Sequence, residues 1–392
     1  MENRYDVVVI GGGIHGVGVA QATAAAGYSV ALMEARDLAW GTSSRSSKLI
    51  HGGLRYLESG QFSVVRECLR ERALLLQLAP SLVKLTPFYI PIYRDTSRRP
   101  WKIRSGLALY GVLAGFSKGA GFRKVPRSEW GGLDGLQLDG LDAVFQYWDA
   151  QTDDAALTRA VMASAKTLGA DYYQSAQFLS AELDNNQAQL EFEYQQSKHR
   201  VSCQVVVNAG GPWVNHILQR VIPQTLTNAV DLVQGTHMVL DTHLQQGIYY
   251  MESPQDQRAI FAMPWQGKML LGTTESLYKG DPAEVKPLAS ERDYLLETLA
   301  HYFPHYRNNM PDELSSFAGL RVLPKDDGSA FARSRETMLL WNNLDNKKVL
   351  SIYGGKLTAY RATAERVVSQ LKTVLPAIKP IANVNKLALS PV

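Results

Sequence analysis

The chain has few cysteines and little net charge. Only Cys68 and Cys203 occur among its 392 residues, far apart in the sequence. This usage excludes a disulfide scaffold and offers no metal-ligand spacing, so we expect two reduced thiols, no metal and a cytoplasmic protein. Lysine and arginine total 41 against 37 acidic residues, a net charge of +4. That excess is too small for a general nucleic-acid surface.

Long apolar runs are also absent, and we expect no N-terminal targeting segment. No run of 18 apolar residues exists, so we expect no membrane-spanning helix. An apolar strand at Val7–Ile10 leaves no room for the charged and apolar regions of a signal peptide. With 45% hydrophobic residues, the chain predicts a sizeable core. Its length is enough for two domains.

A glycine-rich segment follows the first predicted strand. Tyr5–Ile10 is short, apolar and rich in β-branched residues, which is typical of a buried parallel strand. A helix predicted over 17–26 comes next, and a second strand over 29–33 leads into Glu34. Between strand and helix, three glycines stand in G-x-G-x-x-G register: Gly11, Gly13 and Gly16. This order, with an acid ending the second strand, predicts a dinucleotide-binding Rossmann unit.

Each part of this fingerprint has a physical role. Gly11 permits the tight turn, Gly13 lets the backbone approach a pyrophosphate, and Gly16 lets helix and strand pack closely. The N-terminus of the following helix offers N–H groups and the positive end of a dipole, and Ile14 is a further expected cofactor contact. Glu34, 18 residues after Gly16, is placed to accept hydrogen bonds from ribose hydroxyls.

Two distant segments favour FAD over NAD as the dinucleotide. VVVNAGGPW at 205–213 predicts a strand that ends in small residues, and VLSIYGGK at 349–356 predicts another strand, with a helix at 358–371. Chains that bind FAD through an N-terminal Rossmann unit typically return to it twice in this way. The last helix would stabilise negative charge on the reduced flavin. The expected cofactor contacts here are Gly210, Trp213, Gly355, Lys356, Leu357 and Thr358.

The stretch GTSSRSSKLIHGGLRYLE at 41–58 combines hydroxyls, glycines, cations and a histidine. Its hydroxyls predict contacts with the cofactor pyrophosphate, with a plain solvated serine loop as the alternative; they belong to Thr42, Ser43, Ser46 and Ser47. His51 is a candidate general base, because neutral histidine suits removal of an alcohol proton near pH 7. The alternative is a structural or flavin-contacting histidine.

With the fingerprint, this stretch, NAGGPW, GTTESLYKGDP, AGLRVL and YGGKLTAYR in order, the chain resembles the FAD-dependent, aerobic and quinone-linked glycerol-3-phosphate dehydrogenases. The resemblance runs from Tyr5 to about Leu371. It implies an α/β fold with a Rossmann-type FAD domain of the glucose-inhibited/D-amino-acid-oxidase-like class. The substrate domain would be a discontinuous, mixed or antiparallel β-sheet. Family members usually continue into a C-terminal helical domain, which we expect to be missing because the chain stops at Val392.

The resemblance also assigns roles on the substrate side. It implies oxidation of sn-glycerol 3-phosphate to dihydroxyacetone phosphate by hydride transfer to flavin N5, with electrons passed to quinone or another acceptor. The catalytic group would be His51, Arg321 and Lys356. Arginine gives a phosphate bidentate donors, and the implied substrate contacts are Arg55, Tyr56, Arg321, Arg335, Lys356 and Thr274. For each arginine, a solvated or ion-paired surface charge is the alternative.

Two other functions stay open. One is an FAD-dependent oxidase or dehydrogenase of another anionic substrate, a 2-hydroxy acid or an amino acid, since a carboxylate also binds arginine. The other is a flavin-bearing electron-transfer subunit of a complex. The sequence leaves the oligomeric state open.

The segment 84–127 carries ten cations against one acid, Asp95, around an apolar stretch from Trp101 to Phe116. This pattern suits an interfacial helix on the inner face of the cytoplasmic membrane. The alternative is an amphipathic helix that packs on its own domain. We assign 1–75, 145–219 and 323–392 to the FAD-binding domain, and 76–144 and 220–322 to the substrate domain.

Overall fold

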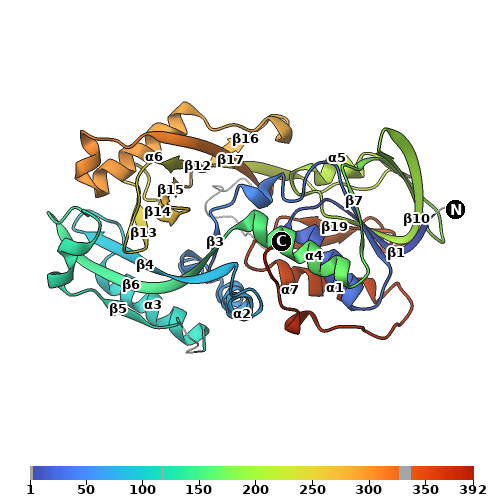
Figure 1. Cartoon of the computed structure of the whole chain (residues 1–392), viewed down its shortest axis with the longest axis horizontal. Helices are drawn as coiled ribbons and strands as arrows, with labels where there is room; N and C mark the ends of the chain where they lie inside the picture. The colour runs from blue at the N-terminus through green and yellow to red at the C-terminus, as the bar shows by residue number, and fades with distance from the viewer. Residues whose placement is uncertain (1–2, 116–118, 326–336) are drawn as a thin grey trace.

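The computed structural model describes residues 3–115, 119–325 and 337–392, which form two β-sheets with helices around them. In Figure 1 the first sheet, with α1 (Ile14–Ala25), α4 (Asp154–Thr167) and α7 (Tyr360–Leu371), occupies the right part of the molecule. The second sheet occupies the left part, with α3 (Pro100–Leu113) below it and α6 (Ala289–Tyr302) above. Both chain ends lie with the first sheet.

The first sheet has nine strands in the order β11-β8-β9-β10-β1-β2-β7, and β19 adds to β10 and carries β18. Its centre is parallel, because β10 and β2 flank β1 and β19 runs parallel to β10. The strands are β1 (Asn3–Ile10), β2 (Val30–Glu34), β7 (Asp171–Gln174), β8 (Gln177–Leu183), β9 (Ala188–Tyr194), β10 (Ser197–Asn208), β11 (Val221–Ile222), β18 (Met338–Trp341) and β19 (Val349–Tyr353).

Alternation along β1 explains why this sheet is buried on both faces. Val7 and Val9 pack into a core shared with α1, α4 and α7. Val8 and Ile10 point the other way, into a core formed with β8, β9 and β10. Successive side chains of a strand point to opposite faces, so an apolar run such as YDVVVI can serve two cores.

The second sheet has ten strands in the order β16-β12-β15-β14-β13-β4-β6-β3, with β17 on β12 and β5 on β6. All its pairs are antiparallel except β13 with β4, so the sheet is mixed. The strands are β3 (Leu49–Ile50), β4 (Val83–Tyr93), β5 (Phe122–Lys124), β6 (Leu141–Thr152), β12 (Val230–Leu240), β13 (Ile248–Glu252), β14 (Ala259–Trp265), β15 (Lys268–Gly272), β16 (Ser276–Tyr278) and β17 (Glu313–Pro324). The α/β architecture with a mixed second sheet is the one that the sequence predicted.

The chain passes back and forth between the two sheets several times. Strands of the first sheet come from 3–34, 171–222 and 338–353, and strands of the second come from 49–50, 83–152 and 230–324. β6 and β17 each extend across one of the boundaries that the sequence suggested, near 145 and 323. The division into domains at those positions stays a prediction.

The basic segment 84–127 does not form one helix. It divides into β4, α3 and β5, and residues 116–118, with Phe116 and Lys118, lie outside the described part. Ile103, Leu107 and Tyr110 are buried on the inner face of α3, while Trp101 is 71% and Val112 57% exposed. The helix therefore packs on its own domain and still presents apolar side chains outward.

A membrane role for α3 stays a prediction. In the described part of the chain, no helix is long and apolar enough to cross a bilayer. Two further helices are α2 (Phe62–Leu78) and the short α5 (Val214–Leu218).

Candidate active site

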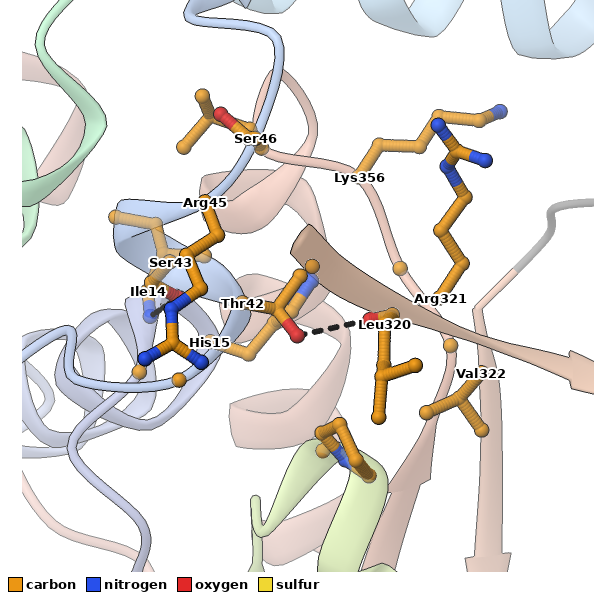
Figure 2. A pocket seen from close by; sticks show the side chains of 18 of the residues that line it. Ile14, His15, Thr42, Ser43, Arg45, Ser46, Leu320, Arg321, Val322 and Lys356 are labelled. Atoms are coloured by element: carbon orange, nitrogen blue, oxygen red, sulfur yellow. Dashed lines mark hydrogen bonds between the residues drawn. The ribbon is translucent and has the colours of Figure 1, made fainter. Parts of the chain in front are cut away.

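A cavity of about 560 Å³ lies between the two sheets. Both Gly11 at the end of β1 and Arg321 in β17 line it. All the predicted cofactor and substrate residues in the described part of the chain line this cavity, with the exception of Gly16. Arg335 lies outside the described residues. Figure 2 shows a part of the wall, with Thr42, Arg45, Arg321 and Lys356 contributed by segments far apart in the sequence.

The fingerprint glycines bring three backbone segments into contact. Gly11 has φ +110°, and a side chain there would meet the carbonyl oxygen of Ala209 at 2.6 Å. A side chain at Gly16 would run into the carbonyl of Gly11, so Gly16 serves packing behind the cavity wall. At the start of α1, the Ile14 N–H donates to the Ser43 hydroxyl at 2.9 Å. The cavity therefore reaches backbone N–H groups, as a pyrophosphate requires.

Glu34 closes this end of the cavity at the end of β2. Its carboxylate accepts the Gly12 N–H at 2.6 Å and the Arg36 N–H at 2.8 Å. Burial raises the pKa of Glu34, and these donors oppose the rise. An acceptor fixed at the second strand end fits the ribose of a dinucleotide.

The predicted pyrophosphate hydroxyls lie on the cavity wall and also bind protein groups. Thr42 donates to the carbonyl of Leu320 in β17 at 2.8 Å, as Figure 2 shows. The Ser46 hydroxyl donates to Asp154 at 2.6 Å, and the Ser47 hydroxyl lies 2.9 Å from Nε2 of His237. These bonds fix the loop between β17, α4 and β12. The role of the hydroxyls toward the pyrophosphate stays a prediction.

Two arginines that the sequence reading missed line the same end of the cavity. The guanidinium carbons of Arg36 and Arg45 lie 3.9 and 5.0 Å from the ring centre of Trp40. The Trp40 ring is in turn 5.9 Å from that of Trp213. Burial, and then the positive charge of Arg36, lower the pKa of Arg45. A partly desolvated Arg45 beside the exposed Arg36 on the same ring favours an anionic ligand in the adjoining space.

At the other end, the turn before α7 meets the His51 segment. Gly355 has φ +118°, and a side chain there would collide with the imidazole of His15. Burial, and then the charge of Arg366, lower the pKa of His15 to about 4, so this imidazole is neutral at pH 7. Thr358 bonds to the backbone of His51 and so joins the two segments.

The three cations that the sequence predicted as substrate contacts, Arg55, Arg321 and Lys356, lie on the cavity wall. Arg321 donates to the Thr273 hydroxyl at 3.3 Å and lies 3.5 Å from a carboxylate oxygen of Glu275. The Lys356 ammonium lies 4.3 Å from the ring centre of Tyr56, and the guanidinium carbon of Arg55 lies 5.3 Å from it. In Figure 2, Arg321 and Lys356 extend toward the same side of the cavity.

Thr274 also reaches the wall, but its hydroxyl bonds within the protein. It donates to Glu291 at 2.9 Å and accepts the Thr236 N–H at 2.9 Å. His237, which the sequence reading missed, stacks on Phe317 with ring centres 5.1 Å apart. Burial, with the charges of Arg321 and Lys48, holds the pKa of His237 well below its ordinary value. Only the pairing of β12 with β15 and β17 brings this histidine to the cavity, so no local motif marks it.

These features define a class of protein. A Rossmann glycine turn, an acid at the second strand end, a helix N-terminus and cations line one cavity and together fit FAD. The arrangement is that of an FAD-dependent oxidoreductase. The comparison with known protein families agrees: residues 6–361 match the family described as FAD dependent oxidoreductase (DAO). The chain belongs to this family, and FAD is its cofactor.

Similar proteins come from several bacteria. Glycerol-3-phosphate dehydrogenase of Pseudomonas aeruginosa is 37% identical over 388 residues, 96% of this chain and 73% of that protein. D-erythritol 1-phosphate dehydrogenase of Brucella abortus is 36% identical over 378 residues, 95% of this chain and 74% of that protein. The glycerol-3-phosphate dehydrogenase-like character that the sequence suggested is therefore confirmed.

Solved structures show the same architecture. Glycerol-3-phosphate dehydrogenase from Bacillus halodurans, complexed with FAD, superposes with a TM-score of 0.78 at 27% identity, over 99% of this chain and 68% of that chain. Glycine oxidase from Geobacillus kaustophilus has a TM-score of 0.72 at 18% identity, over 99% of both chains. The second likeness shows the fold alone.

Proposed function

We propose that this protein oxidises sn-glycerol 3-phosphate to dihydroxyacetone phosphate and passes the electrons to quinone or another acceptor. The observation that carries the proposal is the presence of His51, Arg55, Arg321 and Lys356 on the wall of one cavity. An imidazole can take the proton of the alcohol that is oxidised, and three cations can bind a phosphate on the same molecule. The phosphorylated polyols named for relatives at 36–37% identity support the same choice.

Each residue has a chemical task in this reaction. Arg55 and Arg321 hold the phosphate, because guanidinium groups give a dianion paired donors. Lys356 lies near them and stabilises negative charge on the substrate oxygen as its proton leaves. His51 takes that proton, since an imidazole is a suitable base near pH 7. Bound FAD supplies the hydride acceptor.

A second substrate is supported by the relative from Brucella abortus, which is named for D-erythritol 1-phosphate. That molecule has the same phosphate and secondary-alcohol chemistry on a longer chain. A cavity of about 560 Å³ is in the size range of small-molecule sites, so size does not separate the two.

The experiment is anaerobic reduction of the bound flavin. Purified protein with FAD is mixed with sn-glycerol 3-phosphate, D-erythritol phosphate, a 2-hydroxy acid or an amino acid, and absorbance is followed at about 450 nm, a general flavin band. We expect fast bleaching by glycerol 3-phosphate. Bleaching by amino acids or hydroxy acids alone would contradict the proposal and favour the alternative oxidases.

Arg321 provides a sharper test of the pocket. Arg321→Ala removes a charged phosphate contact, and we expect kcat/KM to fall by a factor equivalent to about 2–4 kcal/mol. Arg292→Ala is the matched control, because Arg292 pairs with Glu313 and its side chain is 45% exposed. The control is expected to keep wild-type kcat/KM. Equal values for both variants and the wild type would remove Arg321 from the site.

A further inference from the structure

The main chain around His51 is held from two sides. The Thr358 hydroxyl accepts the His51 N–H at 3.1 Å and lies 3.3 Å from the His51 carbonyl oxygen. The next N–H, of Gly52, donates to the Tyr110 hydroxyl at 2.8 Å. Thr358 lies on the cavity wall, whereas Tyr110 belongs to α3 behind it. His51 therefore has both neighbouring peptide groups fixed.

The Tyr110 hydroxyl has a defined direction. It donates to Asp149 at 2.6 Å, and Tyr110 is only 2% exposed. Burial, and then the negative charge of Asp149, raise the pKa of Tyr110 well above its ordinary value, so the phenol stays protonated. Its single proton is used toward Asp149, which leaves the oxygen as an acceptor for the Gly52 N–H.

A buried ion pair supports this hydroxyl. Arg72 of α2 donates to Asp149 of β6 at 2.5 Å, and both side chains are about 1% exposed. The same guanidinium nitrogen donates to the carbonyl of Trp148 at 2.9 Å. Burial opposes the charge of Arg72, but Asp149, Tyr110 and Tyr147 together raise the pKa of Arg72. Asp149 therefore accepts Arg72 on Oδ1 and the Tyr110 hydroxyl on Oδ2.

The absence of a side chain at Gly52 lets α3 approach the turn after His51 closely. A side chain at Gly52 would meet Leu69 of α2 at 2.6 Å and collide with the Tyr110 hydroxyl. Gly53, at φ +74°, then turns the chain toward Arg55. The close approach means that a shift of the Tyr110 hydroxyl is passed directly to the His51–Gly52 peptide.

We propose that Tyr110 is a positioning residue for His51, and acts through the Gly52 N–H from outside the cavity. Arg72 and Asp149 fix the phenol, the phenol fixes the peptide, and the peptide sets the direction of the imidazole. The consequence for catalysis rests on the proposed function, whereas the consequence for the backbone does not.

The test replaces the phenol by a ring of nearly equal size. Tyr110→Phe removes the 2.8 Å acceptor of the buried Gly52 N–H and leaves it only the longer contact with Asp149 at 3.4 Å. Tyr89→Phe is the control, because Tyr89 is also buried in the second sheet and its hydroxyl accepts from Gln146 at 3.0 Å. We expect Tyr110→Phe to lower the rate constant of flavin reduction by glycerol 3-phosphate about tenfold to a hundredfold. The substrate concentration for half-maximal rate should change less than about twofold, since the cationic contacts remain.

A second measurement is independent of the reaction. Hydrogen–deuterium exchange of the peptide spanning 49–57 reports the Gly52 amide. Exchange there is expected to accelerate in Tyr110→Phe and to match the wild type in Tyr89→Phe. Unchanged exchange and an unchanged reduction rate would overturn the positioning role, as would equal effects in both variants. If the wild-type flavin is not reduced by glycerol 3-phosphate, the proposed function fails, and the exchange result alone decides for or against Tyr110.

Discussion

The buried ion pair between Lys48 and Asp154 gives a prediction with a definite sign. Asp154, at the start of α4, is fully buried and accepts from Lys48 at 2.6 Å and from the N–H and hydroxyl of Ser46 at 3.0 and 2.6 Å. The Lys48 ammonium also donates to the carbonyl of Ser44 at 2.5 Å. One carboxylate therefore anchors Ser46 and Lys48 in the loop on the cavity wall.

Asp154→Asn keeps the shape of the side chain and removes its charge. Lys48 would then be buried without a counter-charge, and loss of one partner from a buried pair costs about 3–5 kcal/mol. We expect the free energy of unfolding to fall by about that amount. Because the loop lines the cavity, FAD release should occur at lower denaturant concentration in the same variant.

The double variant Lys48→Met/Asp154→Asn separates charge from shape. Burial raises the pKa of Asp154 even though Lys48 and the Ser46 donors oppose the rise, so these contacts do not fully offset the burial of the carboxylate. With both charges removed, we expect the double variant to be more stable than Asp154→Asn alone. Denaturant unfolding, followed by circular dichroism and flavin fluorescence, measures both. A double variant no more stable than Asp154→Asn alone would refute the reasoning.

Two further predictions concern the cofactor side. Arg45→Ala should weaken FAD binding about tenfold to a hundredfold, most strongly at low salt, because its partly desolvated guanidinium lies on the cavity wall. Titration of FAD-free protein, followed by flavin fluorescence, measures the affinity, and a change below twofold would count against this role. His15 has a pKa near 4 in the folded protein, so below its ordinary pKa the unfolded chain binds a proton that the folded chain does not. Stability should fall between pH 7 and pH 5 by up to about 2 kcal/mol from this group, and His15→Gln should lose that dependence in denaturant unfolding.

The local part of the site follows from the sequence, since its residues are neighbours in the chain. The glycine spacing, the strand before it and Glu34 after it are read from 34 consecutive residues, and the structure places them around the predicted turn. The GGK segment is equally local, because β19 ends at Tyr353 directly before it. Short-range patterns of this kind are set by the backbone geometry that they require.

The partners of these residues do not follow from the sequence. Hydroxyls at Ser46 and Ser47 suggest a phosphate loop, but their composition does not reveal that Asp154 and His237 bind the same groups. Arg45 stands inside the recognised stretch, yet its position on Trp40 depends on how the loop folds back. Asp154 belongs to α4 and His237 to β12, so these contacts depend on elements from distant parts of the chain.

The stretch 41–58 is held by different elements at its two ends, and this division predicts how variants should behave. Its first half is fixed by the Leu320 carbonyl and by Asp154, and its second half by Thr358 and Tyr110. Substitutions at the first anchors should therefore change FAD affinity more than the reduction rate, and those at Tyr110 the reverse. Loss of both properties from either end would mean that the stretch moves as one rigid unit. In that case Lys48, which lies between the two halves and is held at 2.6 Å by Asp154, would transmit the displacement.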